Sequence, residues 1–502
     1  MKIRRGLAVL LALIGLASPA LCEGTFSMMG LEADGSGRDW SQNLFFVRMA
    51  ERTGVSFTFR QYGEEKAYQM AKEEAFADGN LPDVLFKANL TPQEEMDYLA
   101  SGQLVDLAPY LSTYAPNLSA ILVARPEWAR VITQPNGAIT SLPIFNGADR
   151  QCCIWINAVW MDALGLAMPV TIEEYTDVLR AFRDGDPNGN GKRDEIPLSI
   201  VGSWEARFLL HAWGLTPNDY NLYVDDGGAV RFAPFDPAYR SFVEWLNMAL
   251  TESLIDKDAF RQMQGGRTAT LSDKEAPLAI GGMVSFAPYT LLDLAQATNY
   301  AALTPLEYNG ERVYRQFLNG VGRGTFAITS ACEDIPAVLT WADYLYTEEG
   351  GRLAFAGLEG EDYTISENGA WEWNGDADYG RLSEIAKNHI IAGDAQTPGL
   401  EPAAFIRNME IEADNHVRRQ TDMIRGYLVE AFPAIWPTNA AREARIAEIQ
   451  GALGVCVDTA IANFAMGLVE LNDENWQAFQ EELLALGAEE FVLLWQEVYD
   501  ER

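Results

Sequence analysis

The sequence is poor in the residues that most often carry covalent or metal-assisted chemistry. Its 502 residues include only three histidines and five cysteines. The histidines, His211, His389 and His416, stand in no metal-binding or nucleophile pattern. The chain also contains no Gly-x-Ser-x-Gly elbow, no phosphate loop of the Gly-x-x-x-x-Gly-Lys type and no His-Glu-x-x-His helix. The usual signatures of hydrolases, nucleotide-binding enzymes and zinc proteases are therefore missing, and we expect no catalytic residue.

Cysteine is too sparse for a disulfide scaffold and has no zinc-binding spacing. Cys152 and Cys153 are neighbours in an apolar, strand-like segment. Because successive side chains of a strand point to opposite faces, we expect both thiols to lie in the core, unbonded to each other.

Positive charge is equally scarce, with 37 Lys and Arg against 72 Asp and Glu, a formal net charge of −35. This balance lacks the basic footprint of a nucleic-acid-binding protein and disfavours anionic membranes. The net charge of the chain does not determine the charge of a binding pocket, where local Arg and Lys can still contact an acidic ligand. So many acidic residues also form pairs by chance, so paired carboxylates alone do not indicate a glycosidase.

The N-terminus has the pattern of an export signal. Lys2, Arg4 and Arg5 precede the apolar segment 7–16, which is short for a membrane span. Removing residues 1–22, with three positive charges and no acid, changes the net charge from −35 to −38. A lipid anchor at Cys22 is an alternative to free secretion, although Leu21 is too bulky for a good lipobox. We expect an exported protein, secreted or held at the cell surface.

The segment 186–197 places oxygen-bearing side chains at alternate positions around a glycine. Calcium prefers six to eight oxygen ligands, and a tight loop presents side chains 1, 3, 5 and 9 and carbonyl 7 inward. Position 12, where an EF-hand has its glutamate, is Pro197. The acid available instead is at position 10. The predicted Ca²⁺ ligands are Asp186, Asn188, Asn190, the Lys192 carbonyl, Asp194 and Glu195. The alternative interpretation is a solvated Asn/Gly turn without metal.

The flanks of this loop predict a structural rather than a switching site. Thr171 and Glu174 have capping-box spacing, and an apolar stripe follows as far as Phe182, so a helix leads into the loop. The segment 196–200 is short, apolar and strand-like. A helix, ion loop and strand in this order stabilise a fold.

With its flanks, this loop resembles the family 1 extracellular solute-binding proteins, particularly an oligosaccharide-binding branch that includes alginate-binding members. The resemblance covers nearly the whole chain after residue 23 and depends on the collinear order of short blocks. These blocks are Arg52–Val55, Gly79–Leu85, Gly102–Leu107, Tyr114–Leu118, Pro135–Ile139, Ile154–Asn157, Trp160–Leu166, Pro169–Thr171, Asp194–Pro197, Tyr344–Gly350, Glu359–Tyr363 and Asn475–Phe479.

The resemblance implies an α/β fold of the two-lobed, type II periplasmic-binding-protein-like class, with a cleft between the lobes. Alternating strands and helices agree with such a fold and predict largely parallel sheets. The implied function is capture of an oligosaccharide or similar solute, delivered by a monomeric receptor to the permease subunits of an ATP-binding cassette importer. A secreted glycan-active hydrolase using paired carboxylates is the alternative.

No linker or repeat divides the chain, so we expect interwoven lobes. After the signal peptide 1–22, lobe one is assigned to 24–146 and 322–428. Lobe two is assigned to 147–321, with the calcium loop 186–195, and to 429–502. In the last part we expect two amphipathic helices separated at Gly487.

A sugar site needs flat aromatic faces and a few polar groups. Tyr289 follows the segment 282–288, which resembles a strand and loop that carry a stacking aromatic in maltose-type relatives. Trp436 falls where those relatives have another aromatic near the hinge. Trp40 and Trp204 complete the predicted solute-binding set. For each of the four residues, a buried or rim position is the alternative.

Overall fold

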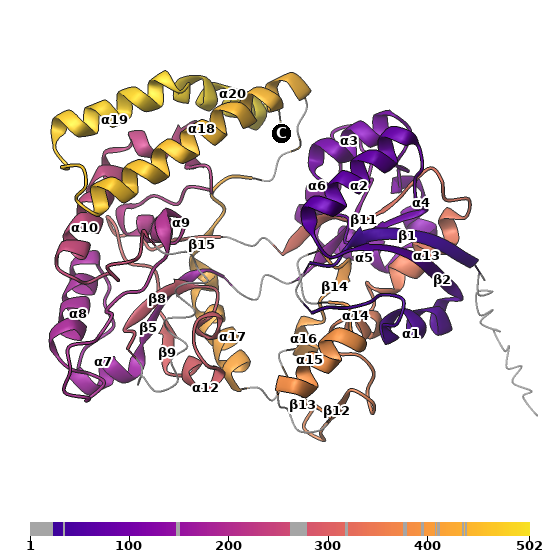
Figure 1. The fold of residues 1–502 in the computed structure, drawn as a ribbon, viewed down its shortest axis with the longest axis horizontal. Helices are drawn as coiled ribbons and strands as arrows, with labels where there is room; N and C mark the ends of the chain where they lie inside the picture. The colour runs from indigo at the N-terminus through magenta and orange to yellow at the C-terminus, as the bar shows by residue number, and fades with distance from the viewer. Residues whose placement is uncertain are drawn as a thin grey trace, which may run out of the picture.

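The computed structural model describes residues 24–33, 36–146, 151–261, 279–316, 320–374, 379–392, 396–406, 408, 412–433, 436 and 439–501. The elements form two lobes lying side by side (Figure 1). The chain passes between the lobes several times, so each lobe is assembled from segments far apart in sequence. The predicted export segment and Cys22 lie outside the described residues.

Lobe one is built around a six-stranded sheet with the order β14-β4-β11-β3-β1-β2. Its strands are β1 (Gly24–Leu31), β2 (Val55–Tyr62), β3 (Val84–Phe86), β4 (Leu142–Phe145), β11 (Val321–Ile328) and β14 (Gly399–Leu400). β1 is parallel to β2 and β3, and β14 is parallel to β4. β11 enters between β3 and β4 and is antiparallel to both.

Helices cover both faces of this sheet, and a small hairpin lies beside it. The helices are α1 (Leu44–Thr53), α2 (Glu65–Asp78), α3 (Pro92–Ala100), α4 (Ala108–Tyr114), α5 (Pro116–Ala124), α6 (Pro126–Ile132), α13 (Ile335–Tyr344), α14 (Glu348–Phe355), α15 (Tyr379–Asn388) and α16 (Ala403–Ile406), and the hairpin strands are β12 (Tyr363–Ile365) and β13 (Trp371–Trp373). Met28 and Met29 are both fully buried but belong to different apolar clusters. Adjacent strand residues thus fill opposite faces of the sheet, as the pleat requires.

The central sheet of lobe two has the order β8-β5-β9. Its strands are β5 (Cys153–Asn157), β8 (Gly282–Ser285) and β9 (Tyr300–Ala302), and smaller pairs are β6 (Leu222–Val224) with β7 (Val230–Phe232) and β10 (Tyr314–Arg315) with β15 (Leu428–Val429). β5 is antiparallel to both neighbours. The prediction of largely parallel sheets is therefore wrong for this lobe, because β8 and β9 run against β5.

The helices of lobe two pack on both faces of this sheet. They are α7 (Ala158–Leu164), α8 (Ile172–Asp184), α9 (Gly202–Ala206), α10 (Pro237–Thr251), α12 (Leu294–Ala297), α17 (Glu412–Ile424), α18 (Ala440–Ala465), α19 (Asp473–Ala485) and α20 (Ala488–Asp500), with short 3-10 turns η1 (Arg207–Trp213), η2 (Ala233–Phe235), η3 (Pro288–Thr290) and η4 (Arg425–Tyr427). Cys152 and Cys153 are buried, free, and in different clusters on opposite sides of β5, as predicted.

One boundary differs from the sequence-based assignment. α17 was assigned to lobe one, but it contacts β9 and α12. Its residues Val417 and Ile424 lie in the apolar cluster of Trp155 and Met283. The chain has therefore returned to lobe two before residue 412, not after 428. An amphipathic helix gave no signal of which lobe its apolar face would cover.

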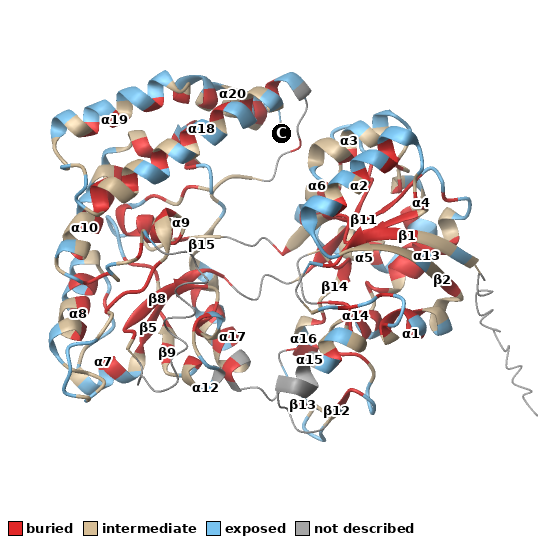
Figure 2. Ribbon diagram, in the orientation of Figure 1, coloured by how far each residue is buried: buried red, intermediate tan, exposed pale blue. Residues whose placement is uncertain are grey.

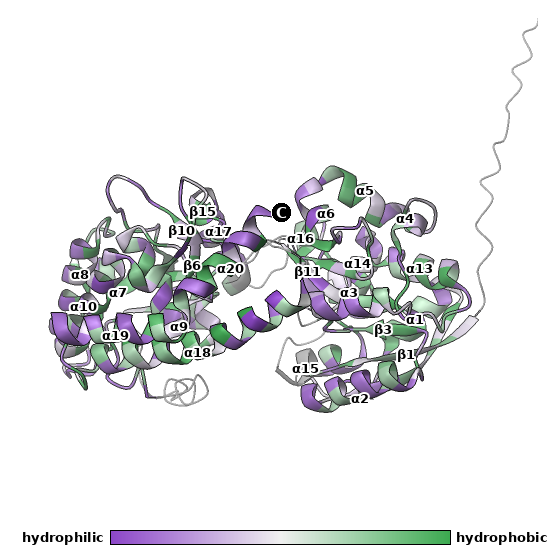
Figure 3. Ribbon diagram, turned by 90° about the horizontal axis from the view of Figure 1, so that it is seen from above, coloured by the Kyte–Doolittle hydropathy of each residue, from purple (hydrophilic) through white to green (hydrophobic). Residues whose placement is uncertain are grey.

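The C-terminal helices form a layer on lobe two. Gly487, with a φ of +97°, separates α19 from α20 as predicted. Buried residues fill the centre of both lobes (Figure 2). Hydrophilic and hydrophobic residues alternate along α18 to α20, and the N-terminal end of α18 lies toward lobe one (Figure 3). Among the described residues, no helix combines the length and apolar character needed to cross a membrane.

Candidate functional site

The predicted ion loop follows directly from α8, the helix that the sequence pattern predicted. The Thr171 hydroxyl accepts a hydrogen bond from the Glu174 amide at 3.3 Å, and the Glu174 carboxylate accepts one from the Val170 amide at 2.7 Å. The loop turns at Gly189 and Gly191, with φ of +68° and +73°. These left-handed conformations favour glycine and bend the backbone around the side chain of Asp186.

Oxygen side chains of the loop converge on one another. Asp186 Oδ1 accepts the Asn190 amide at 3.0 Å, and Asp186 Oδ2 accepts the Gly191 amide at 3.1 Å. The Asn190 side-chain amide donates to both Asp194 oxygens, at 3.0 and 3.1 Å. These bonds lower the pKa of Asp194. The Asn188 side-chain amide also donates to Asp194, at 3.3 Å. Amide donors thus occupy acceptor sites that a cation would otherwise use.

Glu195 supplies a further acceptor. Among the described residues its Oε1 is buried and has no hydrogen-bond partner. Burial raises the pKa of Glu195, and the charges of Asp194 and Asp186 raise it further. A bound cation would offset both effects. The described residues contain no close group of three His, Cys, Asp or Glu side chains that forms a metal site. The donor set of this loop nevertheless fits calcium, because it is all oxygen and leaves one buried oxygen unpaired.

Trp204 lies on α9 in lobe two and joins a polar cluster. Its indole N–H donates to Asp219 Oδ1 at 3.2 Å, and the same oxygen accepts from Arg315 Nη2 at 2.9 Å. Trp204 packs edge-to-face on Phe208 with ring centroids 5.1 Å apart. The indole is partly exposed. An aromatic face beside a held carboxylate is an arrangement suited to a sugar.

Tyr289 lies in η3, the short turn that follows β8. It is partly exposed and packs against the buried cluster that includes Cys153 and Trp155. Trp204 and Tyr289 therefore both belong to lobe two. They pack against different apolar clusters, Trp204 against the one that includes Cys152 and Tyr289 against the one that includes Cys153, and these clusters lie on opposite sides of β5.

Trp436 lies between β15 and α18, two elements of lobe two, but its ring contacts lobe one. The guanidinium carbon of Arg323, on β11, lies 3.8 Å from the centroid of the indole. Trp436 is 7% exposed, and its Nε1 has no hydrogen-bond partner among the described residues. One face of this predicted stacking residue is therefore covered by an arginine.

Trp40 does not offer a stacking face. It is completely buried, with Phe59 and Phe86 packed edge-on against it. Its indole N–H donates to Glu32 Oε2 at 2.8 Å. The prediction that Trp40 contacts the solute is corrected by this burial. The sequence placed Trp40 after a strand but could not show that the following loop folds back over the sheet.

Glu32 is the centre of a buried ionic network in lobe one. Lys87 Nζ lies 2.9 and 3.0 Å from its two carboxylate oxygens, and Arg38 Nη1 lies 2.9 Å from Oε1. Arg38 also donates to the carbonyls of Ala386 and Ala392. The network ties the loop after β1 to the residue that follows β3, to α15 and to the segment after α15.

A second buried carboxylate, Glu95 on α3, lies beside Arg323. Glu95 Oε2 accepts hydroxyl hydrogen bonds from Thr140 and Ser141, each at 2.8 Å. Glu95 Oε1 lies 3.9 Å from Arg323 Nε and has no hydrogen-bond partner among the described residues. Sequence reasoning missed Glu95 and Arg323. The available signal was weak, an arginine between two glycines in an otherwise apolar strand.

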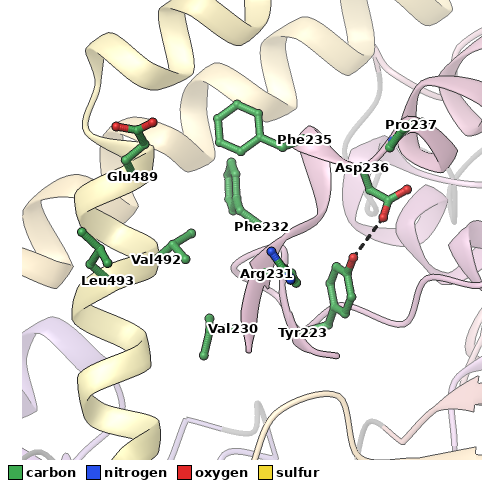
Figure 4. Close-up of a pocket in the computed structure, with 10 residues that line it drawn as sticks. All are labelled: Tyr223, Val230, Arg231, Phe232, Phe235, Asp236, Pro237, Glu489, Val492 and Leu493. Carbon is green, nitrogen blue, oxygen red and sulfur yellow. Dashed lines mark hydrogen bonds between the residues drawn. The ribbon is translucent and has the colours of Figure 1, made fainter. Parts of the chain in front are cut away.

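A separate pocket of about 540 Å³ opens in lobe two between the β6–β7 hairpin and α20 (Figure 4). Its wall includes Phe232 and Phe235, and the Tyr223 hydroxyl donates to Asp236 at 3.0 Å. None of the predicted solute or metal residues lines it. The predicted aromatic residues instead belong to different packing groups. Trp204 and Tyr289 lie in lobe two, Trp40 in the core of lobe one, and Trp436 on Arg323.

Comparison with known proteins agrees with this architecture. No protein-family model matches the sequence. The fructooligosaccharide ABC transporter substrate-binding protein FusA of Streptococcus pneumoniae is 26% identical over 526 residues, covering 97% of this chain and 92% of FusA. The polygalacturonan/rhamnogalacturonan-binding protein YtcQ of Bacillus subtilis is 22% identical and covers 59% of this chain and 58% of its own.

Solved structures show the same fold. A solute-binding protein of Bifidobacterium longum infantis, described as binding HMO and associated with an ABC transporter, has a TM-score of 0.82 at 20% identity, covering 96% of this chain and 99% of its own. FusA in complex with kestose has a TM-score of 0.74 at 22% identity, with 95% and 99% covered. Alginate-binding AlgQ2 without calcium has a TM-score of 0.68 at 20% identity, with 95% and 98% covered. The chain thus has the two-lobed fold of substrate-binding proteins.

Proposed function

We propose that this protein is the extracellular solute-binding protein of an ATP-binding cassette importer and that it captures an oligosaccharide. The observation that carries the proposal is the likeness to FusA, which extends over 97% of the chain in sequence and 95% in structure. A likeness over both lobes supports a shared mode of action better than a local motif would. The proposed partners are the permease subunits at the membrane. We propose that the receptor delivers its solute to them as a monomer.

The solute is proposed to bind between the lobes, where rotation of one lobe against the other encloses it. Trp204 and Tyr289 supply aromatic surface from lobe two, and Asp219 supplies an acceptor already held by Arg315. Trp436 contributes from the segment that reaches lobe one. Aromatic faces pack on the C–H surfaces of sugars, and carboxylates accept hydrogen bonds from their hydroxyls.

We propose that the captured sugar leaves chemically unchanged. The test is to incubate the protein with a mixture of plant, algal and milk oligosaccharides and to recover the bound fraction. A receptor returns intact ligand at no more than one molecule per protein. Conversion of any glycan beyond one equivalent would favour the alternative, a secreted hydrolase with paired carboxylates.

A substitution tests where the sugar binds. Trp204→Ala should weaken binding by about 1–3 kcal/mol if the indole covers the sugar. Trp213→Ala, a buried tryptophan of the same lobe, is the matched control and should lower stability instead. Calorimetric titration measures affinity, and urea unfolding measures stability. If Trp204→Ala keeps full affinity, this tryptophan is not in the site.

We also propose that the loop after α8 binds one structural Ca²⁺ through Asp186, Asn188, Asn190, the Lys192 carbonyl, Asp194 and Glu195. The unpaired Glu195 oxygen and the all-oxygen donor set support the proposal. A FusA structure described as an EF-hand mutant, at 22% identity and a TM-score of 0.73, offers a parallel in a relative. Calcium would neutralise the acidic side chains of the loop and replace the amide donors that now contact Asp194.

Chelation tests the calcium proposal. Because a cation that binds only the folded state stabilises it by mass action, EDTA should reduce stability by about 2–3 kcal/mol when free Ca²⁺ exceeds the Kd about a hundredfold. Asp186→Ala should abolish this effect. Asp225→Ala is the matched control, because Asp225 also accepts amide hydrogen bonds in a glycine-rich turn, from Gly227 and Ala229. An EDTA effect that persists in Asp186→Ala would place the ion elsewhere.

We further propose that the protein is exported, with residues 1–22 as the signal peptide and lipid attachment at Cys22 as the alternative to free secretion. The mass of the mature N-terminal peptide decides between cleavage by the ordinary signal peptidase and acylation at Cys22. A mature protein that begins at Met1 would contradict both.

A further inference from the structure

Three neighbouring residues, Arg323 and the two side chains beside its guanidinium, each have one polar atom without a hydrogen-bond partner among the described residues. The atoms are Glu95 Oε1, Arg323 Nη2 and Trp436 Nε1, and all three are buried. They come from α3, from β11 and from the segment between β15 and α18. Buried polar atoms without partners are rare and costly, so three of them at one place require an explanation.

The arrangement of these groups is held by their surroundings. Glu95 is 0% exposed, and its other oxygen is fixed by the hydroxyls of Thr140 and Ser141. Ser141 Oγ in turn accepts the Gly324 amide at 3.1 Å, one residue from Arg323. Carboxylate and guanidinium are therefore positioned by the same stretch of sheet, with 3.9 Å between Glu95 Oε1 and Arg323 Nε.

The chemistry of the three groups restricts what can satisfy them. The guanidinium and the indole N–H are donors only, whereas an ionised carboxylate is an acceptor only. A hydroxyl group satisfies both kinds, because it donates one hydrogen bond and accepts others. An anionic group would pair with Arg323 but leave Glu95 Oε1 without a donor beside a second negative charge. A protonated amine would pair with Glu95 but would place a second positive charge beside Arg323 and offer its donors no acceptor.

The charge states support this assignment. Burial lowers the pKa of Arg323 to about 10, so it stays cationic at neutral pH. Burial raises the pKa of Glu95, and the charge of Arg323 counteracts this rise. A ligand hydroxyl that donates to Oε1 stabilises the carboxylate form further.

Building on the proposed function, we infer that Glu95, Arg323 and Trp436 form a subsite that recognises a hydroxyl group of a neutral oligosaccharide and disfavours uronic acids. The hydroxyl donates to Glu95 Oε1 and accepts from Arg323 Nη2 and Trp436 Nε1. Trp436 comes from lobe two and the other two residues from lobe one, so the subsite lies where the lobes meet.

The inference is tested by calorimetric titration of the full mature protein with two sets of sugars. The neutral set comprises fructo-oligosaccharides and neutral milk oligosaccharides, and the acidic set comprises oligogalacturonates and alginate oligomers. We expect the wild-type protein to bind a neutral sugar best. Trp436→Phe, which removes the N–H and keeps a ring, and Arg323→Gln should each weaken that binding roughly tenfold or more.

Two further variants separate recognition from structure. Glu95→Gln should reduce the preference for neutral over acidic sugars by about tenfold, since it removes the charge that disfavours uronates. Arg125→Gln removes another arginine stacked on a tryptophan, with its guanidinium carbon 4.0 Å from the Trp128 centroid, and should leave affinity within about twofold. If Arg323→Gln does not fold, Trp436→Phe decides.

Each outcome has a distinct meaning. A wild-type protein that binds acidic sugars best would overturn the inference and leave the receptor function intact. Neutral-sugar affinity unchanged within about twofold in both Trp436→Phe and Arg323→Gln would also overturn it, because the three groups would then hold only water. A folded wild-type protein that binds no saccharide of either set would instead contradict the proposed function itself.

Discussion

Among its described residues, lobe one contains two buried glutamates, Glu32 and Glu95, whose carboxylates have very different numbers of hydrogen-bond partners. Glu32 accepts one hydrogen bond from Arg38, two from Lys87 and one from Trp40. Glu95 accepts two hydrogen bonds on one oxygen and none on the other among the described residues. Both carboxylates are shielded from water. A complete set of partners indicates a structural role, whereas an incomplete set indicates a place for a partner from outside the chain.

The largest expected effect distinguishes the two glutamates by their cations. Lys87→Met removes two charge-assisted hydrogen bonds from Glu32 and should lower the free energy of unfolding by about 3–5 kcal/mol. Arg323→Met removes no hydrogen bond to Glu95, only an ion pair and the stack on Trp436, and should cost about 1–2 kcal/mol. Urea unfolding measures both. Equal losses of unfolding free energy in the two variants would mean that Glu95 has the same structural role as Glu32.

A smaller effect is expected from the two tryptophans. Trp40→Phe leaves Glu32 Oε2 without its indole donor and should cost about 2–3 kcal/mol, since hydrogen bonds to charged groups contribute most. Trp436→Phe removes an N–H that has no partner among the described residues and should cost less than about 1 kcal/mol. Thermal unfolding of the two variants in parallel gives the difference. A greater loss in Trp436→Phe would contradict it.

The smallest expected effect is the pH dependence of the stability that the Glu95 carboxyl contributes. Because burial raises the pKa of Glu95, the folded protein holds a proton there more tightly than the unfolded chain does. Stability from this group is therefore present below about pH 4.3, the unfolded glutamate value, and is lost as pH rises through the higher folded value. Glu95→Gln cannot show this loss.

The measurement is the difference in unfolding free energy between wild type and Glu95→Gln at about pH 4 and pH 7. Relative to the variant, the wild-type protein should lose about 1 kcal/mol between these values. Unfolding is measured without ligand, so that the sugar does not contribute to the difference. Parallel pH profiles would mean that the Glu95 carboxylate is better solvated than its burial indicates.

Local patterns in the sequence predicted the local structures well. The Thr171 cap, the helix into the ion loop and the glycine between the last two helices all depend on residues a few positions apart. The segment 196–200 forms only isolated bridges, to Ile280, Ile255 and Met283, because its partners come from elsewhere in lobe two.

Long-range packing was much less predictable. Trp40 is buried because the loop after β1 folds back onto Phe59 and Phe86, which no nearby residue indicates. Glu95 and Arg323 are 228 positions apart and meet only because β11 enters the first sheet. In a chain with 72 acidic and 37 basic residues, neither could be singled out by its type alone.

The position of β11 also constrains how the chain is made. β11 occupies the middle of the first sheet, between β3 and β4, yet it is synthesised after most of lobe two. A growing chain that has reached β10 therefore holds β1, β2, β3 and β4 without the strand that joins β3 to β4. Since folding units form as their residues emerge, lobe one is completed late. If residues 1–22 act as the proposed export signal, this order delays the folding of lobe one while the chain is still being synthesised.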